Sequence, residues 1–446
     1  MATRRPPEFF GRKGIQVGII GCGYVGLPLA LRFAEQGHQV KGFDTDPEKV
    51  AKLNAGQTYI QHIPADKIAQ LHRSGAFSAT HDFSEIAGRD AVIICVPTPL
   101  DERHDPDLSY VRQTALSIQP HLQRDQLIVL ESTTYPGTTQ ELVLPILEKS
   151  GLRCPLQPDK HAADPATDFY LAFSPEREDP GNTTVARHDI PKVIGGLDPQ
   201  ASEIAAALYG SIFRRTVPVS SPAAAEMTKL LENIYRCVNI ALVNELKMLC
   251  LRMDLNIWEI IDAAATKPFG FHPFYPGPGL GGHCIPVDPF YLSWKAKEFD
   301  FHTRFIELAG EINVAMPYNV IASTISALNQ QKKAINGSKV LVLGVAYKKD
   351  IDDLRESPAL TIIELLQKQG AVVSYNDPYF PFVGRGRKYD LQMNCSSLDN
   401  LGQYDCVLIV TDHSDYDYKK IVNEAKLVVD SRNATRGIKS DKIVHC

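Results

Sequence analysis

Residues 276–288 combine a thiol and a carboxylate with an unusual backbone composition. The stretch reads PGPGLGGHCIPVD, and its four glycines and three prolines exclude a regular helix or a central strand. We therefore predict a loop whose backbone can lie close to a ligand. Cys284 could act as a nucleophile, and Asp288, four residues later, could act as an acid or a base. The alternative is a surface turn that carries a buried structural cysteine.

A second glycine motif, GCGYVG, lies between a predicted strand at 15–20 and a helical pattern at 27–36. In this context glycines permit a tight turn, let the backbone approach a pyrophosphate and place the phosphates at the helix N-terminus. Asp44 ends the next predicted strand, where a carboxylate accepts the ribose hydroxyls of NAD and disfavours NADP. We predict an NAD site at this motif, formed by Gly21, Gly23, Tyr24, Val25 and Gly26.

Polar loops follow three further apolar segments. Thr98 comes after the run 91–96, and Thr133 follows the predicted strand 127–130. Since the carboxyl ends of strands converge on the ligand in a doubly wound sheet, both threonines are expected to line the cofactor crevice. Each could instead be a turn former or a helix cap. The loop 173–181 carries Glu176 and Arg177 and has a solvated charged turn as its ordinary explanation.

A long amphipathic helix is predicted from Ser221-Pro222 onward. Its apolar face holds Leu231, Ile234, Val238, Leu242 and Leu249. Its polar face holds Glu226, Lys229, Asn233, Arg236, Asn244 and Lys247. A polar face usually meets water. The alternative is that the ridge of Lys229, Asn233 and Arg236 holds an anionic or hydroxylated substrate.

The last third of the chain has the pattern of a second α/β unit. Predicted strands at 339–345, 371–375, 406–411 and 426–430 alternate with loops and a helix that begins at Ser357-Pro358. It lacks a GxGxxG motif, so we predict no second dinucleotide there. Lys348 and Arg432 follow strand ends, where they could hold the phosphates of another nucleotide or be ordinary surface cations.

These patterns predict an α/β protein with two Rossmann-like, doubly wound domains joined by a central long-helix domain. The expected domains are residues 1–213, with a flexible extension at 1–13, residues 214–327 and residues 328–446.

Composition limits the possible partners. The 446 residues carry a net charge of −5 without a basic cluster, which argues against nucleic acid. Nine cysteines occur without a CxxC pair or zinc-like spacing, so we expect free thiols, a cytoplasmic location and no metal. No run of about 20 apolar residues is present, and we expect neither export nor a membrane span.

Over about residues 14–440 the chain resembles the UDP-glucose/GDP-mannose dehydrogenase family, the nucleotide-sugar 6-dehydrogenases. The matching motifs are Gly21 to Gly26 with Asp44, Ser132-Thr133, Ser174-Pro175-Glu176, Lys229 with Asn233, Gly281-Gly282-His283-Cys284 with Asp288, and Tyr347-Lys348-Lys349-Asp350 with Arg355-Glu356-Ser357.

The resemblance implies an N-terminal NAD domain, a C-terminal UDP-binding domain and a homodimer formed by the central helix. It also implies that two NAD⁺ oxidise C6 of the sugar by four electrons through a Cys284 thiohemiacetal and thioester. In that scheme Lys229 is an acid/base and oxyanion stabiliser assisted by Asn233, and Asp288 receives the alcohol proton directly or through water. Glu176 and Thr133 position or activate the hydrolytic water. Which of Lys229 and Asp288 removes the first proton stays open. Arg355 is implied as a further cofactor contact.

Within the family, the chain looks like the branch that oxidises UDP-N-acetylhexosamines for surface polysaccharide precursors. UDP-glucose enzymes typically have Phe where Arg177 stands and Lys where Val287 stands. UDP-N-acetylglucosamine is the expected substrate, with UDP-N-acetylmannosamine, UDP-N-acetylgalactosamine and UDP-glucose as alternatives. The implied substrate contacts are Arg177, Lys229, Asn233, Arg236, His272, Gly281, Tyr347, Lys348 and Arg432.

Two other classes remain as alternatives. A single-hydride hydroxyacid dehydrogenase shares a Rossmann domain and a helical middle with a Lys/Asn pair, but it has no use for Cys284 or a third domain. A non-catalytic, NAD-gated scaffold would not need a cysteine, a lysine and a carboxylate together.

Overall fold

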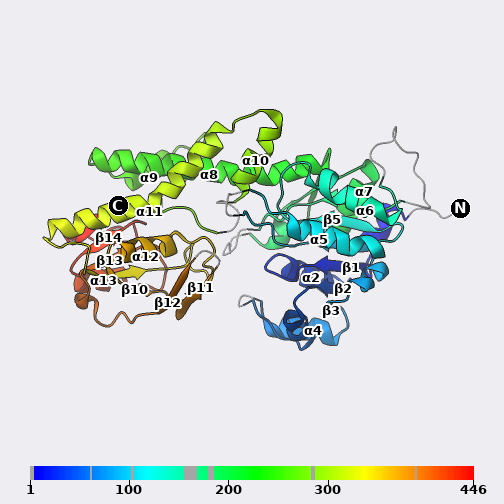
Figure 1. Ribbon diagram of the computed structural model, residues 1–446, viewed down its shortest axis with the longest axis horizontal. Coiled ribbons are helices and arrows are strands. Elements are labelled where there is room, and N and C mark those ends of the chain that lie inside the picture. The colour runs from blue at the N-terminus through cyan, green and yellow to red at the C-terminus, as the bar shows by residue number, and fades with distance from the viewer. Residues whose placement is uncertain are drawn as a thin grey trace. The chain divides into compact units, whose positions relative to one another are not determined.

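The computed structural model describes residues 5–60, 63–101, 105–154, 168–178, 185–282, 287–386 and 389–446 (Figure 1). The chain divides into two compact units. The first comprises Met1–Glu232 and Trp294–Phe301, and the second comprises Asn233–Ser293 and His302–Cys446. Cys284, the predicted nucleophile, lies outside the described residues.

The first unit is built on an eight-stranded sheet with the order β3-β2-β1-β4-β5-β6-β7-β8. Its strands are β1 Gln16–Ile20, β2 Gln39–Phe43, β3 Phe77–Thr80, β4 Ala91–Ile94, β5 Leu127–Leu130, β6 Tyr170–Phe173, β7 Lys192–Gly196 and β8 Thr216–Val219. All neighbours run parallel except β6 and β7. The order reverses between β1 and β4, which is the topological switch point where ligands bind in such sheets. The predicted doubly wound sheet is confirmed.

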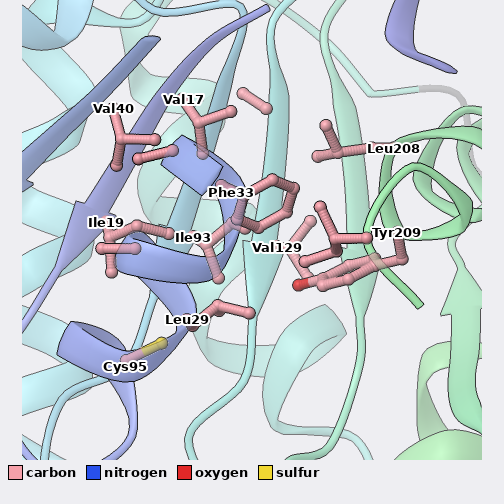
Figure 2. Close-up of a cluster of buried hydrophobic side chains, with 14 of the residues drawn as sticks. Val17, Ile19, Leu29, Phe33, Val40, Ile93, Cys95, Val129, Leu208 and Tyr209 are labelled. Carbon is pink, nitrogen blue, oxygen red and sulfur yellow. The ribbon is translucent and has the colours of Figure 1, made fainter. Parts of the chain in front are cut away.

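Helices cover both faces of this sheet, because its central strands are apolar on both sides. They are α1 Pro7–Gly11, α2 Gly26–Glu35, α3 Pro47–Asn54, α4 Ala65–Arg73, α5 Ser109–Ile118, α6 Leu144–Leu147 and α7 Pro199–Gly210, with short turns η1 Phe83–Gly88, η2 Gln119–His121, η3 Thr139–Val143, η4 Glu148–Ser150 and η5 Arg187–Asp189. Figure 2 shows one face of the core, where Ile93 of β4, Phe33 of α2 and Tyr209 of α7 lie together.

The expected flexible extension needs correction. Residues 7–11 form α1, and Phe10 is fully buried with its ring centroid 6.5 Å from that of Tyr170. Burying a Phe side chain stabilises a fold by about 1.5–3 kcal/mol, which offsets part of the entropy cost of ordering this turn.

The predicted long helix is α8 Pro222–Arg252, the long green helix of Figure 1. It is followed by α9 Ile257–Ala265, α10 Asp288–Ala296, η6 Lys297–Phe299 and α11 Arg304–Gln330. The polar face of a helix usually meets water, but on α8 it is turned toward protein. Its residues Lys229, Asn233 and Lys247 are buried. On the apolar face, Leu231, Leu242 and Leu249 are 60%, 52% and 51% exposed.

The second unit contains a five-stranded parallel sheet with the order β10-β9-β13-β14-β15. The strands are β9 Lys339–Leu343, β10 Val372–Asn376, β13 Cys406–Ile409, β14 Val428–Asp430 and β15 Ile443–His445. Helices α12 Pro358–Lys368 and α13 Tyr418–Glu424, the turn η7 Leu401–Gln403 and the hairpin of β11 Phe382–Arg385 with β12 Asp390–Asn394 complete it. The order reverses between β9 and β13, so this sheet is also doubly wound.

Candidate active site

The loop between β1 and α2 has the steric properties of a pyrophosphate cradle. Gly21 has a φ of +92°, and a Cβ on it would lie 2.6 Å from the carbonyl oxygen of Cys95. A Cβ on Gly26 would lie 2.0 Å from the carbonyl oxygen of Gly21, so only glycine lets α2 pack this closely on the strand. A Cβ on Gly23 would meet no atom within 4 Å. The loop is therefore rigid at both ends and open in the middle, as phosphates at a helix N-terminus require.

Asp44 stands beside this loop at the end of β2. One carboxylate oxygen accepts the backbone N–H of Cys22 at 3.0 Å, and the other accepts that of Asp46 at 3.0 Å. These bonds hold the carboxylate next to the glycines and leave further lone pairs for ribose hydroxyls. Burial, followed by the charge of Asp44, raises the pKa of the Cys22 thiol well above its usual range. Cys22 is therefore an inert thiol despite its place in the motif.

The next two strand ends converge on the same edge of the sheet. The register aligns Ile20 with Ile94 and Ile94 with Leu130. Thr98 is buried beyond β4, and Thr133 is half-buried beyond β5. The Ser132 hydroxyl donates to the carbonyl oxygen of Val96 at 2.7 Å and so ties the two loops together.

Glu176, just after β6, belongs to a buried cluster of charges. Its carboxylate lies 3.4 Å from Lys192 Nζ and 3.4 Å from Arg187 Nη2, and it accepts the backbone N–H groups of Arg177 and Glu178. Burial opposes the charged form, but Lys192, Arg187 and Lys229 outweigh it and lower the pKa of Glu176 to about 2. Glu176 is thus a carboxylate at neutral pH.

Glu131, at the end of β5, completes the cluster. Its carboxylate lies 3.1 Å from Lys192 Nζ and accepts a hydrogen bond from the Tyr209 hydroxyl. Sequence reasoning did not single out Glu131, Lys192 or Arg187. The available signal was the polar loop that begins with Glu131 directly at a strand end.

Two side chains of α8 contact the loop after β6. Lys229 donates to the carbonyl oxygen of Glu176 at 2.6 Å. Glu232 accepts two hydrogen bonds from the guanidinium of Arg177, at 2.5 and 3.1 Å. A third nitrogen of Arg177 donates to the carbonyl oxygen of Pro191 at 2.8 Å. The structure therefore gives Arg177 a role in holding its own loop.

In the second unit, Asn233 and Asp288 form a buried pair. The Asn233 amide nitrogen donates to a carboxylate oxygen of Asp288 at 2.5 Å. Asn233 lies one helical turn beyond Lys229 on α8, and Asp288 is the first residue of α10. The predicted residues thus form two groups, Lys229 with Glu176 and Asn233 with Asp288.

The glycine-rich loop that precedes Cys284 packs within the second unit. A Cβ on Gly281 would lie 2.5 Å from the Cβ of Tyr347, and a Cβ on Gly277 would lie 2.4 Å from Nη1 of Arg432. Gly282 donates its N–H to the carbonyl oxygen of Arg355 at 2.8 Å. The loop thereby brings three predicted residues, Gly281, Tyr347 and Arg432, into one region.

The remaining predicted residues have separate environments. The Arg355 guanidinium is paired with Asp353, with contacts of 2.6 and 2.9 Å to one carboxylate oxygen. His272 is exposed, with its Nδ1 3.2 Å from the Tyr235 hydroxyl. Arg236 and Lys348 are half-buried.

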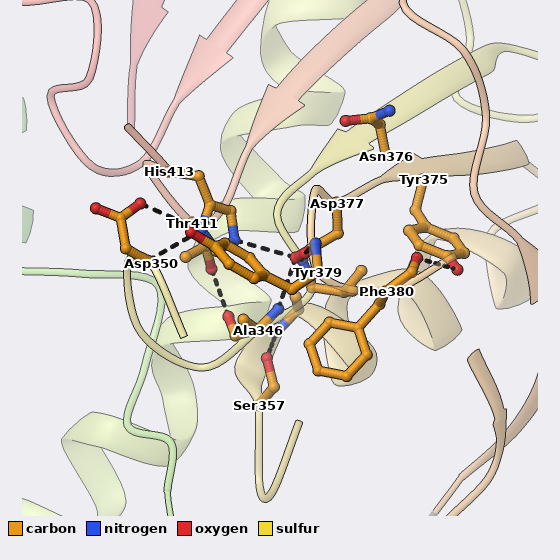
Figure 3. A network of polar contacts seen from close by, with 12 residues as sticks. Ala346, Asp350, Ser357, Tyr375, Asn376, Asp377, Tyr379, Phe380, Thr411 and His413 are labelled. Carbon is orange, nitrogen blue, oxygen red and sulfur yellow. Dashed lines mark hydrogen bonds and ion pairs between the residues drawn. The ribbon is translucent and has the colours of Figure 1, made fainter. Parts of the chain in front are cut away.

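A polar network joins the loops at the switch point of the second sheet (Figure 3). Asp377, after β10, accepts the N–H groups of Val345 and Ala346 at 2.7 and 3.0 Å, and its Oδ2 lies 3.1 Å from His413 Nε2. The Thr411 hydroxyl donates to the carbonyl oxygen of Ala346 at 2.6 Å. The loops after β9 and β13 are therefore bound to each other.

Three domains of one family match the chain. The NAD binding domain of the UDP-glucose/GDP-mannose dehydrogenase family matches residues 15–213, its central domain 223–315 and its UDP binding domain 341–437. The chain belongs to the UDP-glucose/GDP-mannose dehydrogenase family. It is an NAD-dependent nucleotide-sugar dehydrogenase, and the open cradle at Gly23 and Asp44 fits that cofactor.

Several characterised relatives span nearly the whole chain. The chain is 33% identical to UDP-N-acetyl-D-glucosamine 6-dehydrogenase of Pseudomonas aeruginosa over 417 residues. This aligned region covers 93% of this chain and 94% of the relative. It is 34% identical over 424 residues to NDP-N-acetyl-D-galactosaminuronic acid dehydrogenase of Ralstonia nicotianae, covering 93% and 95%. Its structure resembles that of UDP-D-ManNAc dehydrogenase from Pyrococcus horikoshii, with a TM-score of 0.84, 32% identity and coverage of 97% and 99%.

Neither a membrane-spanning helix nor a cluster of metal-ligating side chains occurs among the described residues. Within that part of the chain, no helix is long and apolar enough to cross a membrane. Among the same residues, no group of three or more His, Cys, Asp or Glu side chains could hold a metal ion.

Proposed function

We propose that this dehydrogenase oxidises the C6 hydroxyl of a UDP-N-acetylhexosamine to the carboxylate, with UDP-N-acetylglucosamine as the preferred substrate. The observation that carries the proposal is the buried polar ridge of α8, where Lys229 contacts the Glu176 backbone and Asn233 contacts Asp288. A dehydrogenase with two oxidation steps needs buried groups of this kind to stabilise an oxyanion and accept a proton. The named relatives act on N-acetylated sugar nucleotides, which supports the substrate class.

The aldehyde intermediate must stay covalently bound to the enzyme between the two oxidation steps. NAD supplies the hydride acceptor, and two are consumed per substrate. Asp288 or Lys229 takes the proton of the C6 hydroxyl in the first step. The Cys284 thiolate then adds to the aldehyde carbon, and the second oxidation leaves a thioester. Water cleaves the C–S bond, which releases the carboxylate and restores the thiol. Lys229 and Asn233 stabilise the oxygen that carries negative charge in these steps.

Glu176 orients the hydrolytic water in this proposal. With a pKa of about 2 it is a weak base, so its role is to accept a hydrogen bond from the water rather than to remove its proton. Thr133, half-buried beyond β5, is the second group proposed to contact that water.

The UDP moiety is assigned to the second unit. Tyr347, Lys348 and Arg432 lie in loops at the carboxyl ends of its strands, where ligands bind in doubly wound sheets. Gly281 packs against Tyr347, so the loop before Cys284 would be held beside this nucleotide. Because Arg177 is engaged by Glu232 and Pro191, we assign the acetamido contact to Arg236 and His272 instead.

A homodimer through α8 accounts for its exposed apolar face. Leu231, Leu242 and Leu249 recur on one side of the helix and are each at least half exposed. Contiguous exposed apolar surface of this kind marks a protein interface. We expect a dimer in light scattering, and Leu242→Asp to give monomers, whereas substitution of the exposed Glu203 on α7 should leave the dimer intact.

We propose a cytoplasmic location, which the free thiols support. The eight cysteines within the described residues are free. Free thiols persist in reducing compartments.

The test is an assay of the purified protein with NAD⁺ and a panel of sugar nucleotides. The panel contains UDP-glucose, GDP-mannose and the UDP-N-acetyl derivatives of glucosamine, mannosamine and galactosamine. We expect UDP-N-acetylglucosamine to give the highest kcat/KM and two NADH per sugar. A yield of one would indicate a single-hydride dehydrogenase, and a yield of zero a scaffold. Cys284→Ser should abolish turnover and leave NAD binding intact, because an ester would replace the thioester.

A further inference from the structure

Three charged side chains on one side of α8 contact two loops of the first unit, the loop after β5 and the loop after β6. Glu226, Lys229 and Glu232 are spaced by three residues, so they lie along one side of the helix. Glu226 contacts the segment after the Thr133 loop, Lys229 contacts Glu176, and Glu232 contacts Arg177. The second and third contacts involve residues of the predicted site, whereas Glu226 has no role in the proposed chemistry.

We propose that Glu226 is a positioning residue that fixes Lys229 relative to the loop carrying Thr133. The inference rests on the proposed function, in which both residues act on the substrate or its hydrolytic water. One carboxylate of α8 is bound to the end of that loop, and the lysine lies one turn further along the same helix.

The contacts of Glu226 are short and buried. One oxygen accepts the backbone N–H of Gly137 at 2.6 Å. The other accepts the backbone N–H of Thr139 at 2.9 Å and the Thr139 hydroxyl at 2.7 Å. The side chain is fully buried. Charge-assisted hydrogen bonds to backbone donors are about twice as strong as neutral ones and fix direction as well as distance.

A contribution to folding stability does not by itself explain the presence of a carboxylate at position 226. Burial raises the pKa of Glu226 to about 7 in spite of its hydrogen bonds, and the nearby Glu141 raises it further. The charged form is therefore costly at this position. A carboxylate that is retained at such a cost is more consistent with a geometric task than with a contribution to folding.

The task that we assign to Glu226 is to fix the position of Lys229 relative to the loops after β5 and β6. Lys229 Nζ donates to the backbone oxygen of Glu176, so any movement of α8 would also move the contact to the loop after β6. A misplacement of roughly 1 Å at a catalytic group can cost about 100-fold in rate. Removal of Glu226 would release α8 from the loop after β5 and leave the Lys229 side chain chemically intact.

The experiment compares Glu226→Ala and Glu226→Gln with Glu203→Ala, a substitution of an exposed residue on α7. Hydrogen exchange of peptides spanning residues 132–141 reports on the Gly137 and Thr139 amides without any need for activity. We expect faster exchange in Glu226→Ala, a smaller increase in Glu226→Gln, which keeps one acceptor, and no change in Glu203→Ala. The kcat per folded enzyme should fall roughly 10- to 100-fold in Glu226→Ala while the Kd for NAD stays within about twofold.

A double-mutant cycle separates positioning from a merely structural role. If Glu226 acts through Lys229, Glu226→Ala should change kcat by less than about twofold in a Lys229→Ala background. Equal fold-losses in both backgrounds, or wild-type exchange at 132–141, would overturn the proposal. If the alanine variant does not fold, the same readings on Glu226→Gln decide. If no sugar nucleotide is oxidised by the wild-type enzyme, the proposed function fails, and the exchange data still decide whether Glu226 holds the loop.

Discussion

The two sheets place an acidic residue at the same topological point, yet the surroundings of the two residues differ. Asp44 follows β2 and accepts the N–H of Cys22, and Asp377 follows β10 and accepts the N–H groups of Val345 and Ala346. In the first sheet the adjacent Gly23 faces free space. In the second, His413 binds Asp377 and the loops after the first and third strands are joined. The winding of a sheet therefore does not determine its ligand. The side chains that fill the switch point do.

The largest changes in NAD affinity and in stability are expected when side chains are added at the two switch points. Gly23→Val would project into the open space of the cradle, so NAD affinity should fall at least about 100-fold with little change in melting temperature. In Gly344→Ala, a Cβ would lie 2.4 Å from the carbonyl oxygen of Thr411 at a φ of +82°. Overpacking with such a φ should destabilise the protein by about 1–3 kcal/mol and leave NAD affinity unchanged.

Calorimetric NAD titration and thermal melting of both variants check this contrast. If Gly23→Val loses stability and keeps its affinity, the cradle has been assigned to the wrong loop.

The acidic residues provide the next comparison. In Asp44→Asn, one accepting oxygen becomes a donor, and the loss of charged hydrogen bonds to ribose should cost about 1.5–3 kcal/mol, roughly 10- to 100-fold in the KM for NAD. The preference for NAD over NADP should narrow, since the carboxylate that repels a 2′-phosphate is gone. Asp377→Asn should leave both cofactor constants unchanged. Steady-state kinetics with NAD and NADP measure this, and equal effects of the two substitutions would contradict the comparison.

The NAD cradle could be predicted from the sequence because the residues that form it lie close together in the chain. A strand, three glycines, a helix and an acidic residue occur within about 30 residues, and each has one steric or electrostatic task. The same holds for the winding of the second sheet, where the loop after β9 and the Ser357-Pro358 helix start were both readable.

The orientation of α8 could not be predicted in the same way. A periodic pattern shows that two faces differ but does not state which one meets protein. Here the polar face is buried because Glu226, Lys229, Glu232 and Asn233 each find partners far away in the sequence.

The charge cluster around Glu176 was missed for a topological reason. Strand β7 runs antiparallel to β6, with Phe173 opposite Gly195. Continuing that register by three residues brings Lys192 opposite Glu176. In an all-parallel sheet, the first residue of β7 would lie at the far edge, so Lys192 had no apparent link to the site.

A smaller effect should come from Lys192 itself. In Lys192→Met, Glu176 loses the cation that contributes most to lowering its pKa, so that pKa should rise toward the value favoured by burial. The acid limb of the pH profile of kcat should then move to higher pH, because a protonated Glu176 is a weaker hydrogen-bond acceptor for water than the carboxylate. The matched control is Lys41→Met, which removes a partly exposed ion pair with Glu85. An unchanged profile would exclude Glu176 from the rate-limiting chemistry.

The smallest expected effect concerns the pH dependence of the free energy of unfolding. Two buried carboxyl groups, Asp377 and Glu226, should contribute to it with opposite signs. Hydrogen bonding and charge from His413 lower the pKa of Asp377 against the opposing effect of burial. Its contribution to the free energy of unfolding is present above the unfolded pKa of about 4 and is lost as pH falls below it. Burial raises the pKa of Glu226 to about 7, so its contribution decreases as pH rises from about 4.5 to 7. In urea titrations, Asp377→Asn should therefore flatten the acid limb of stability, and Glu226→Gln should flatten the slope between pH 5 and 7. Because the two groups lie in different units, the double variant should show the sum of both changes. A single variant that flattened both regions would mean that the two sites are coupled.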